Sequence, residues 1–534
     1  MKKSIFTSVS AAALMFSAAA VAQNNNSTVN QPGSGATATV SQNGEDSNST
    51  IFQAGNLNKA KVNQDGAVEG GNSFINQTGS NNEADLKQND DGSDFFGTAP
   101  PINVSSINQT GSSNKAKVDQ DTTGFAGLTV SAISQSGNGN EATVGQIDDY
   151  QESYITQSSD NNTALVNQGD LVGLLSENSF GNDSFINQGG TGSNDATVNQ
   201  KGNYGTSSIN QTGGNNDASV TQAAGSQFLP NNVSSVLQSG NGNAATVNQT
   251  NDNSSSIVQS GNNGIAKVTQ TGLNISTVDQ QAGNNVAIVN QDGDSISSVL
   301  QLANGNAARI IQEGSGNSSS VLQNAGVGTL SYTSFELGEA VLNDPNGTAF
   351  AVVKQDGDDL ISQVSSTGRS NFAFIQQVGS KNESYVNQTG NGTAAFVEQA
   401  GEDNKSYFAQ SGNRTNVSTS ETPGVGDDNI EFAQGVHQTG DRNFSSVSQS
   451  GSSTTFGLTN LVNVKQSGDD NDSFVDQSGV DNNASLTQGG NLNLSYITQA
   501  GTSNTATVSQ GSNSNISSVN QSGIGSTAAV VQGM

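Results

Sequence analysis

Hydrophobic and polar residues alternate with a period of two along most of the chain. In the segment from Asn515 to Gln521, Ser517, Val519 and Gln521 fall on one side, and the positions between them are mostly polar. Such alternation is typical of β-strands, whose successive side chains point to opposite faces. The pattern therefore predicts many short strands, each with one buried face, built on the motif Asn-x-(Ser/Ala)-x-(Val/Ile)-x-Gln-x-Gly.

The motif recurs at a fixed spacing. The position four before its Gln alternates between Ser and Ala, as in Ser495, Ala506, Ser517 and Ala528, so the full repeat has 22 residues and two strands. A period of this length is typical of stacked repeats, and we expect about 20 of them. Successive motifs end on Gln31, Gln42, Gln53 and Gln64 near the start of the chain, and on Gln466, Gln477, Gln488, Gln499, Gln510, Gln521 and Gln532 at its end.

Each repeat predicts one strand–turn–strand rung, because a single rung cannot bury its inner face alone but stacked rungs can. The fold class expected is an all-β β-solenoid with two parallel, in-register sheets. Stacking at about 4.8 Å places Gln over Gln and Asn over Asn, including Asn504 and Asn515. Each amide then donates to one neighbour and accepts from the other, whereas an unpaired amide would cost about 1–3 kcal/mol.

The turns are short and begin with glycine two residues after the Gln. We expect these glycines to adopt a positive φ, which glycine reaches without steric cost. The turn glycines predicted in the last repeats are Gly468, Gly479, Gly490, Gly501 and Gly523.

One elongated repeat domain is expected over residues 23–534, interrupted by insertions near 89–102, 169–182, 324–347, 411–431 and 451–459. Four of the six prolines lie in these insertions, and proline cannot donate to a strand ladder. We therefore interpret the insertions as loops that leave the turns. The register also survives a defect at Ser366, where the expected Gln is lost and Gln377 resumes the pattern.

The N-terminus predicts a signal peptide over residues 1–22. Lys2 and Lys3 precede an apolar stretch, and Ala20-Val21-Ala22 forms a small-residue cleavage pattern. The apolar stretch is too short for a membrane anchor, and no later run of about 20 apolar residues follows. The sequence thus predicts a secreted protein without membrane insertion.

Composition and charge narrow the function further. The 534 residues carry a formal charge of −29 and no Cys, and only 31% are hydrophobic. The acidic balance argues against nucleic-acid binding, which needs a basic surface, and the lack of Cys excludes a disulfide scaffold. His437 is the only histidine and is expected at the surface, so we predict no catalytic residues, no metal site and no cofactor.

Acidic pairs raise the possibility of calcium binding at the turns. Oxygen-rich turns suit Ca²⁺, but the sequence lacks the tandem Gly-Gly-x-Gly-x-Asp pattern of calcium-binding β-rolls, so turn-favouring Asp is the preferred interpretation. The pairs are Asp148-Asp149, Asp358-Asp359, Asp427-Asp428 and Asp469-Asp470.

Aromatic residues recur at one outward position. Tyr385 and Tyr407 are one repeat apart, as are Phe474 and Tyr496, and each pair should stack on adjacent rungs. Two interpretations are open: an exposed contact for lateral bundling or adhesion, or the ordinary preference of aromatics for strands.

Paired strands such as Asn504-x-Ala506-x-Val508-x-Gln510, joined by Gln-x-Gly-x-x-Asn turns, resemble the curlin repeat of curli fibres. The resemblance covers nearly all of the mature chain, which has many more repeats than the family's typically short subunits. It implies an extracellular, curli-like (fimbria-like) amyloid fibre at the surface of a Gram-negative-type bacterium. It also implies an outer-membrane secretion machinery and a nucleator as partners, and roles in biofilm matrix and cell adhesion.

The expected function is therefore structural: self-association by end-to-end stacking, because the first and last motifs lack a cap that would block strand addition. The alternative is a surface solenoid that does not polymerise and acts as an adhesin or binding rod. An ice-binding rod is disfavoured because outward Thr residues are scattered, and an enzyme is disfavoured by the single His and few bases.

Overall fold

The structure is a computed structural model that describes residues 24–43, 46–66, 71–90, 103–122, 128–147, 150–169, 181–223, 232–324, 349–413, 435–451 and 460–533. The predicted signal peptide and most residues of the predicted insertions lie outside these ranges. The chain divides into two compact units, Met1–Asn253 and Ser254–Met534. Among the residues described, no helix is long and apolar enough to cross a bilayer.

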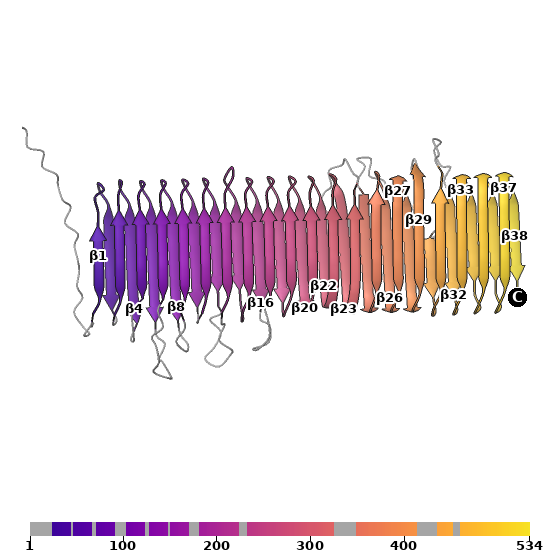
Figure 1. The fold of residues 1–534 in the computed structure, drawn as a ribbon, viewed down its shortest axis with the longest axis horizontal. Helices are drawn as coiled ribbons and strands as arrows, with labels where there is room; N and C mark the ends of the chain where they lie inside the picture. The colour runs from indigo at the N-terminus through magenta and orange to yellow at the C-terminus, as the bar shows by residue number, and fades with distance from the viewer. Residues whose placement is uncertain are drawn as a thin grey trace, which may run out of the picture. The chain divides into compact units, whose positions relative to one another are not determined.

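Unit 1 contains 18 strands among its described residues, which pair into nine rungs. Figure 1 shows them side by side. They are β1 (Asn26–Asn30), β2 (Thr37–Asn43), β3 (Asn48–Gln53), β4 (Lys59–Gly66), β5 (Asn72–Gln77), β6 (Glu83–Asp90), β7 (Val104–Gln109), β8 (Lys115–Thr122), β9 (Val130–Gln135), β10 (Glu141–Ile147), β11 (Glu152–Gln157), β12 (Thr163–Gln168), β13 (Asp183–Gln188), β14 (Asp195–Gln200), β15 (Thr206–Gln211), β16 (Asp217–Ala223), β17 (Val233–Gln238) and β18 (Ala244–Thr250).

Each strand pairs in parallel with the strand two places along the chain, so odd-numbered and even-numbered strands form separate ladders. In the pair β3–β5, Ser49 lies opposite Ser73 and Gln53 opposite Gln77. In the pair β4–β6, Ala60 lies opposite Ala84. The Ser-type and Ala-type strands therefore each stack on their own kind, which explains the alternation in the sequence.

Unit 2 contains 20 strands among its described residues. They are β19 (Ser254–Gln259), β20 (Ile265–Gly272), β21 (Ile275–Gln280), β22 (Val286–Gln301), β23 (Asn306–Gln323), β24 (Ala349–Asp358), β25 (Ile361–Thr367), β26 (Phe372–Ser380), β27 (Glu383–Asn391), β28 (Ala394–Glu402), β29 (Lys405–Asn413), β30 (Gly435–Thr439), β31 (Phe444–Ser450), β32 (Leu461–Ser467), β33 (Asp472–Val480), β34 (Asn483–Gln488), β35 (Leu494–Thr502), β36 (Thr505–Gln510), β37 (Ile516–Ile524) and β38 (Thr527–Gln532).

Two strands of unit 2, β22 and β23, are about twice as long as the others and each contains two motifs. Counting each as two gives 22 strand segments, hence 11 rungs. Their mutual register runs unbroken from Val286/Ala307 to Gln301/Gln323 except for one shift between Asp294 and Ser295. The chain thus turns between the two sheets within one continuous ladder, and Gly293 (φ 123°), Gly314 (96°) and Gly316 (72°) provide the left-handed backbone of the turn.

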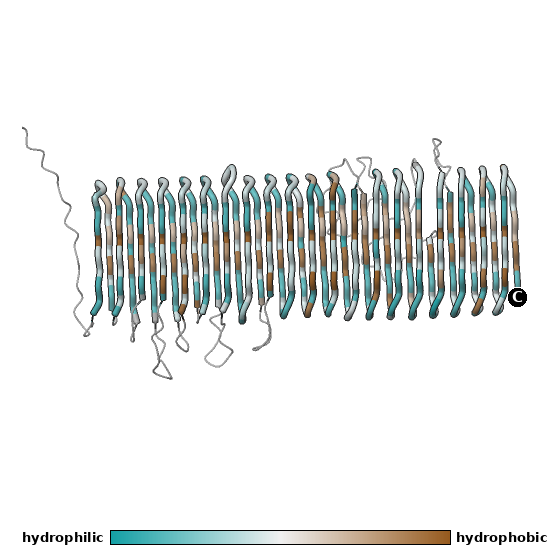
Figure 2. The backbone as a smooth tube through the Cα atoms, viewed as in Figure 1, coloured by the Kyte–Doolittle hydropathy of each residue, from teal (hydrophilic) through white to brown (hydrophobic). Residues whose placement is uncertain are grey.

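The core is a thin layer of inward side chains between the two ladders. Ile155, Val166 and Ala164 are at most 1% exposed, and Ser153, Gln157 and Gln168 are equally buried. Figure 2 shows the apolar positions recurring from strand to strand. The predicted all-β solenoid, with parallel in-register sheets and 22-residue spacing, is confirmed.

Because the layer is thin, each inward aliphatic side chain should contribute strongly to local stability. We expect Ile155→Ala to lower the free energy of unfolding by about 2–5 kcal/mol, the usual cost of truncating a buried aliphatic side chain. Denaturant unfolding followed by circular dichroism measures the change. Thr156→Ala, one residue away on the exposed face, should change it little; equal losses for the two variants would contradict the inward–outward assignment.

Candidate functional site: amide ladders and turns

The Gln side chains form hydrogen-bonded ladders that run along each sheet. At the start of unit 1, Gln31 Nε2 donates to Gln53 Oε1 at 2.6 Å, and Gln42 Nε2 donates to Gln64 Oε1 at 2.9 Å. In every Gln–Gln bond that the structure gives, the earlier residue donates and the later one accepts. The ladder therefore has a direction.

The same ladders run through the last rungs of unit 2. The successive donor–acceptor pairs are Gln466–Gln488 (2.9 Å), Gln488–Gln510 (3.0 Å), Gln510–Gln532 (2.9 Å), Gln477–Gln499 (2.8 Å) and Gln499–Gln521 (2.9 Å).

The Gln amides also tie the two sheets together. Gln477 Nε2 in β33 donates at 2.9 Å to the carbonyl oxygen of Leu461 in β32, and Gln499 Nε2 in β35 donates at 3.0 Å to that of Asn483 in β34. One N–H of each amide thus continues the ladder, while the other reaches the facing sheet. This second role was not apparent from the sequence.

The Asn side chains fasten the turns to neighbouring rungs. Asn482 Oδ1 accepts from both the backbone N–H (3.2 Å) and the Nδ2 (3.0 Å) of Asn504, and Asn504 Nδ2 also donates to Gly523 O at 3.2 Å. Asn515 binds Asn493 Oδ1 in the same way, at 2.9 and 3.0 Å. The Asn ladder is therefore partly a backbone ladder, whereas the sequence suggested side-chain amides alone.

Four of the five turn glycines adopt a positive φ: Gly468 (124°), Gly479 (105°), Gly501 (107°) and Gly523 (128°). Gly490 does not, so the expectation was wrong at this position. A Cβ there would lie 2.5 Å from the carbonyl oxygen of Ser512, so Gly490 is required by close backbone approach. Close approach also constrains Gly468, where a Cβ would lie 2.6 Å from Gly490 O, but not Gly523, where a Cβ would meet no atom within 4 Å.

A second left-handed position lies four residues after many of the described ladder Gln residues, and the sequence had not predicted it. Leu492 (57°), Ser503 (58°) and Ser514 (60°) adopt it, although none is glycine. The Asn, Asp and Gly residues that often occupy this position were the available signal, since Asn and Asp tolerate left-handed geometry.

The family model of the curlin-associated repeat matches residues 192–223, 368–401, 460–490 and 481–511. All four segments contain the ladder Gln and the turn geometry described above. The chain therefore contains curlin-associated repeats. No curated protein sequence matches it.

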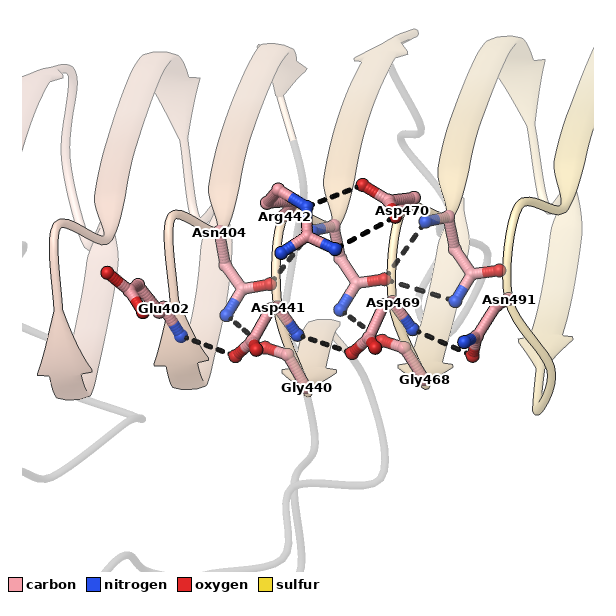
Figure 3. A network of polar contacts seen from close by, with 11 residues as sticks. Glu402, Asn404, Gly440, Asp441, Arg442, Gly468, Asp469, Asp470 and Asn491 are labelled. Atoms are coloured by element: carbon pink, nitrogen blue, oxygen red, sulfur yellow. Dashed lines mark hydrogen bonds and ion pairs between the residues drawn. The ribbon is translucent and has the colours of Figure 1, made fainter.

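The acidic turns of the curlin repeats use their oxygens as backbone acceptors (Figure 3). Asp469 Oδ1 accepts from the backbone N–H of Asp441 at 3.0 Å, and Asp441 Oδ1 accepts likewise from Glu402. Asp470 forms a two-point ion pair with Arg442 at 2.7 and 3.0 Å, which holds the pKa of Asp470 below its usual range. These contacts favour the structural interpretation of the turn carboxylates over calcium binding.

The Asp358-Asp359 pair, which the structure describes, also has a carboxylate that accepts a backbone hydrogen bond. Asp358 Oδ1 accepts from the backbone N–H of Ser315 at 3.0 Å. The pairs 148–149 and 427–428 lie outside the described residues. In the described part of the chain, no group of three or more His, Cys, Asp or Glu residues is placed to hold a metal ion.

The outward aromatic residues are stacked along the curlin repeats of unit 2. The rings of Tyr385 and Tyr407 lie 5.0 Å apart and those of Phe474 and Tyr496 also 5.0 Å apart, with interplanar angles of 7° and 11°. Phe444, which the sequence analysis missed because it sits two positions earlier in its strand, bridges the two pairs. Such pairs contribute about 0.5–1.5 kcal/mol each beyond burial.

His437 was expected at the surface, but its side chain is largely covered. It occupies an outward position of β30, but its side chain is only 15% exposed, and its Nδ1 lies 3.0 Å from Glu398 Oε2. Glu398 and Lys465 flank it in register on the neighbouring strands. In-register stacking therefore covers a side chain that an isolated strand would leave open.

Among the residues that the structure describes, the Gln ladder is interrupted at Ser366 in β25. This residue lies between Gln323 and Gln388 in register, where its short side chain cannot span the gap. Gln323 Nε2 donates only to backbone oxygens of Ala307 and Ala349, both at 2.9 Å. Within the described structure, Gln388 Oε1 and Ser366 Oγ are buried without a hydrogen-bond partner.

Restoring the ladder should stabilise unit 2. We expect Ser366→Gln to raise the free energy of unfolding by about 1–3 kcal/mol, because it pairs a buried amide oxygen that now has no donor. Hydrogen exchange of the β25 and β27 amides, together with denaturant unfolding, measures the gain. Ser365→Gln places the same side chain on the outward face and serves as the control; an equal gain there would mean that the ladder is not the cause.

In-register stacking also places acids on acids, which makes stability depend on pH. Asp195 lies opposite Asp217, and burial together with that neighbour raises the pKa of Asp195; burial and Glu152 likewise raise the pKa of Asp183. A carboxyl whose pKa is higher in the folded than in the unfolded state gains protons on folding, so stability increases as pH falls through that pKa.

We therefore expect unit 1 to resist denaturant better as pH is lowered from neutral towards about 4–5, the range just above ordinary aspartate titration. Asp195→Asn should reduce this pH dependence. The ion pair between Asp470 and Arg442 in unit 2 gives the opposite pH dependence. Because the pKa of Asp470 is lowered, this pair stabilises the fold at neutral pH and is lost only when the pH falls below the usual titration range of aspartate. If the denaturation midpoint of unit 1 decreased as the pH is lowered from neutral to about 4–5, the raised pKa of Asp195 would not be the dominant effect.

Proposed function

We propose that this protein, which contains curlin-associated repeats, is the subunit of an extracellular amyloid-like fibre that grows by end-to-end stacking. The observation that carries the proposal is the exposure of core positions on the two outermost rungs. Ala528 and Val530 in β38 are half-buried, whereas Ala506 and Val508, one rung earlier, are each 1% exposed. Covering these positions with another rung would remove apolar surface from water.

The first rung presents the matching surface. Ala38 and Val40 in β2 are half-buried, whereas Ala60 and Val62 in β4 are 5% and 1% exposed. The first rung pairs a Ser-type β1 with an Ala-type β2, and the last pairs a Ser-type β37 with an Ala-type β38. A second copy can therefore continue both sheets without changing which residues stack.

The amide ladder supports head-to-tail addition. Because these Gln residues donate to the Gln 22 residues later, one rung further along the same sheet, Gln521 and Gln532 present N–H groups to an incoming rung, and Gln42 presents its amide oxygen. Two identical ends would place donor against donor or acceptor against acceptor. Opposite ends extend the ladder in cross-β geometry.

Charge would govern when addition occurs. The formal charge of −29 makes copies repel one another, which suits a chain that must stay soluble before assembly. Within the proposal, the N-terminal signal directs export, secretion machinery and a nucleator act as partners, and the fibre serves biofilm matrix and cell adhesion.

The second candidate is a solenoid adhesin that does not polymerise. The observation that favours it is the exposed aromatic stack, in which Tyr407 and Tyr496 are 40% and 43% exposed. Such a surface could contact another material without any end-to-end contact. Electron microscopy of the secreted protein separates the two candidates, because only the first yields fibres.

The test targets the last rung. Protein starting at Gln23 is expected to form fibres with a cross-β spacing of about 4.7–4.8 Å. Val530→Asp places a charge on the inward side of β38 and should strongly slow elongation, whereas Val531→Asp, on its outward side, carries the same charge and should assemble normally. Discrete rods from the unsubstituted protein, or equal inhibition by both variants, would falsify end-to-end growth through this rung.

A further inference from the structure

Two tyrosines of unit 2 lie at equivalent positions on adjacent strands of one sheet. Tyr385 in β27 is in register with Tyr407 in β29, and the two rings lie 5.0 Å apart between centroids and only 7° from parallel. In-register stacking of identical residues places equivalent atoms above one another. The carbon atoms ortho to the two phenol oxygens therefore face each other.

This pair differs chemically from three other close ring pairs on the outward faces. In those pairs tyrosine lies against phenylalanine: Tyr154–Phe185, Tyr407–Phe444 and Phe474–Tyr496. A phenylalanine ring has no hydroxyl group from which an oxidant can take a hydrogen atom. The stack of Tyr385 on Tyr407, in contrast, brings two oxidisable phenols together within one chain.

Both phenols are within reach of a dissolved oxidant. Tyr407 is 40% exposed, and Tyr385 is partly exposed. Their outward position also leaves the rings room to tilt, because the torsion that turns a tyrosine ring is broad. When two aligned rings tilt towards each other, their ortho carbons come into bonding distance.

A base lies beside the first phenol. The hydroxyl of Tyr385 donates a long hydrogen bond of 3.4 Å to Glu383 Oε2, and Lys405 Nζ lies 2.8 Å from Glu383 Oε1. Burial and the Glu383 carboxylate raise the pKa of Tyr385, so this phenol keeps its proton at neutral pH. Loss of an electron makes a phenol strongly acidic, and Glu383 is placed to accept the proton that is then released.

We propose that Tyr385 and Tyr407 form a modification site at which a one-electron oxidant, such as a peroxide-driven haem peroxidase, produces an intramolecular dityrosine. Each phenol loses one electron and its hydroxyl proton. The two radicals join through their ortho carbons, and the hydrogen on each of these carbons moves to the phenol oxygen. Two tyrosines and one hydrogen peroxide thus give one dityrosine and two waters.

The new bond joins two neighbouring rungs covalently. Strands β27 and β29 are paired through the backbone from Glu383/Lys405 to Asn391/Asn413, and the cross-link adds a bond between side chains. Cross-links stabilise a fold mainly by restricting the unfolded chain. The inference does not rest on the fibre proposal, because both tyrosines belong to the same copy.

The test oxidises protein starting at Gln23, at low concentration, with a haem peroxidase and limiting hydrogen peroxide. Trypsin cleaves after Lys405, between the two tyrosines, so they fall in different peptides, 382–405 and 406–414. In the monomer band of a denaturing gel, we expect mass spectrometry to find these peptides joined, with the loss of two hydrogen atoms, together with dityrosine fluorescence. A link between these peptides that occurs only in dimers or larger species would overturn the proposal.

Variants that keep the ring stack identify the pair. Tyr407→Phe should lose nearly all of the dityrosine in the monomer, whereas Tyr496→Phe, the matched change in a tyrosine–phenylalanine stack, should retain it. Phe474→Tyr places a second phenol against Tyr496, where the rings lie 5.0 Å apart at 11°, and should raise the yield about twofold. This gain keeps the proposal testable if Tyr407→Phe fails to fold. Unchanged dityrosine in Tyr407→Phe, or no gain from Phe474→Tyr, contradicts the assignment.

Discussion

The structure depends on identical side chains lying above one another at the spacing of a β-sheet. A Gln amide in a dry layer has two N–H groups and one oxygen to satisfy, and only a copy of itself one rung away offers the right partner at the right distance. Because the second N–H reaches the facing sheet, the same amide fixes both the stacking and the separation of the sheets. Because the aliphatic core is thin, these hydrogen bonds supply a large part of the stabilisation that a thick hydrophobic core provides in globular domains.

This dependence explains how far the sequence alone could predict the fold. Alternation gave the strands, the Ser/Ala alternation gave the two-strand rung, and the fixed period required stacking. The Gln positions could be predicted because the same residue recurs on the same face. The direct link from Gln477 to Leu461 in the facing sheet could not, because it depends on how the two sheets are offset, which no local pattern encodes.

Expectations drawn from the sequence were wrong at positions whose environment is decided by residues from other rungs. Gly490 was assigned a left-handed conformation from its place in the motif, but the carbonyl of Ser512, 22 residues away, is what excludes a side chain. His437 was placed at the surface from its strand position, yet residues stacked on either side cover it. In each case the missing information was a contact across the stack.

The ladder also has a mechanical consequence within unit 2. Rungs that are joined only to their neighbours carry a pulling force along the stacking direction in series, so every rung bears the same tension and the weakest junction sets the breaking point. The short side chain of Ser366 removes the side-chain link between Gln323 and Gln388, leaving that junction on one sheet to backbone bonds. Under tension along the stacking direction, this junction of unit 2 therefore has one side-chain link fewer than the neighbouring rungs to resist opening.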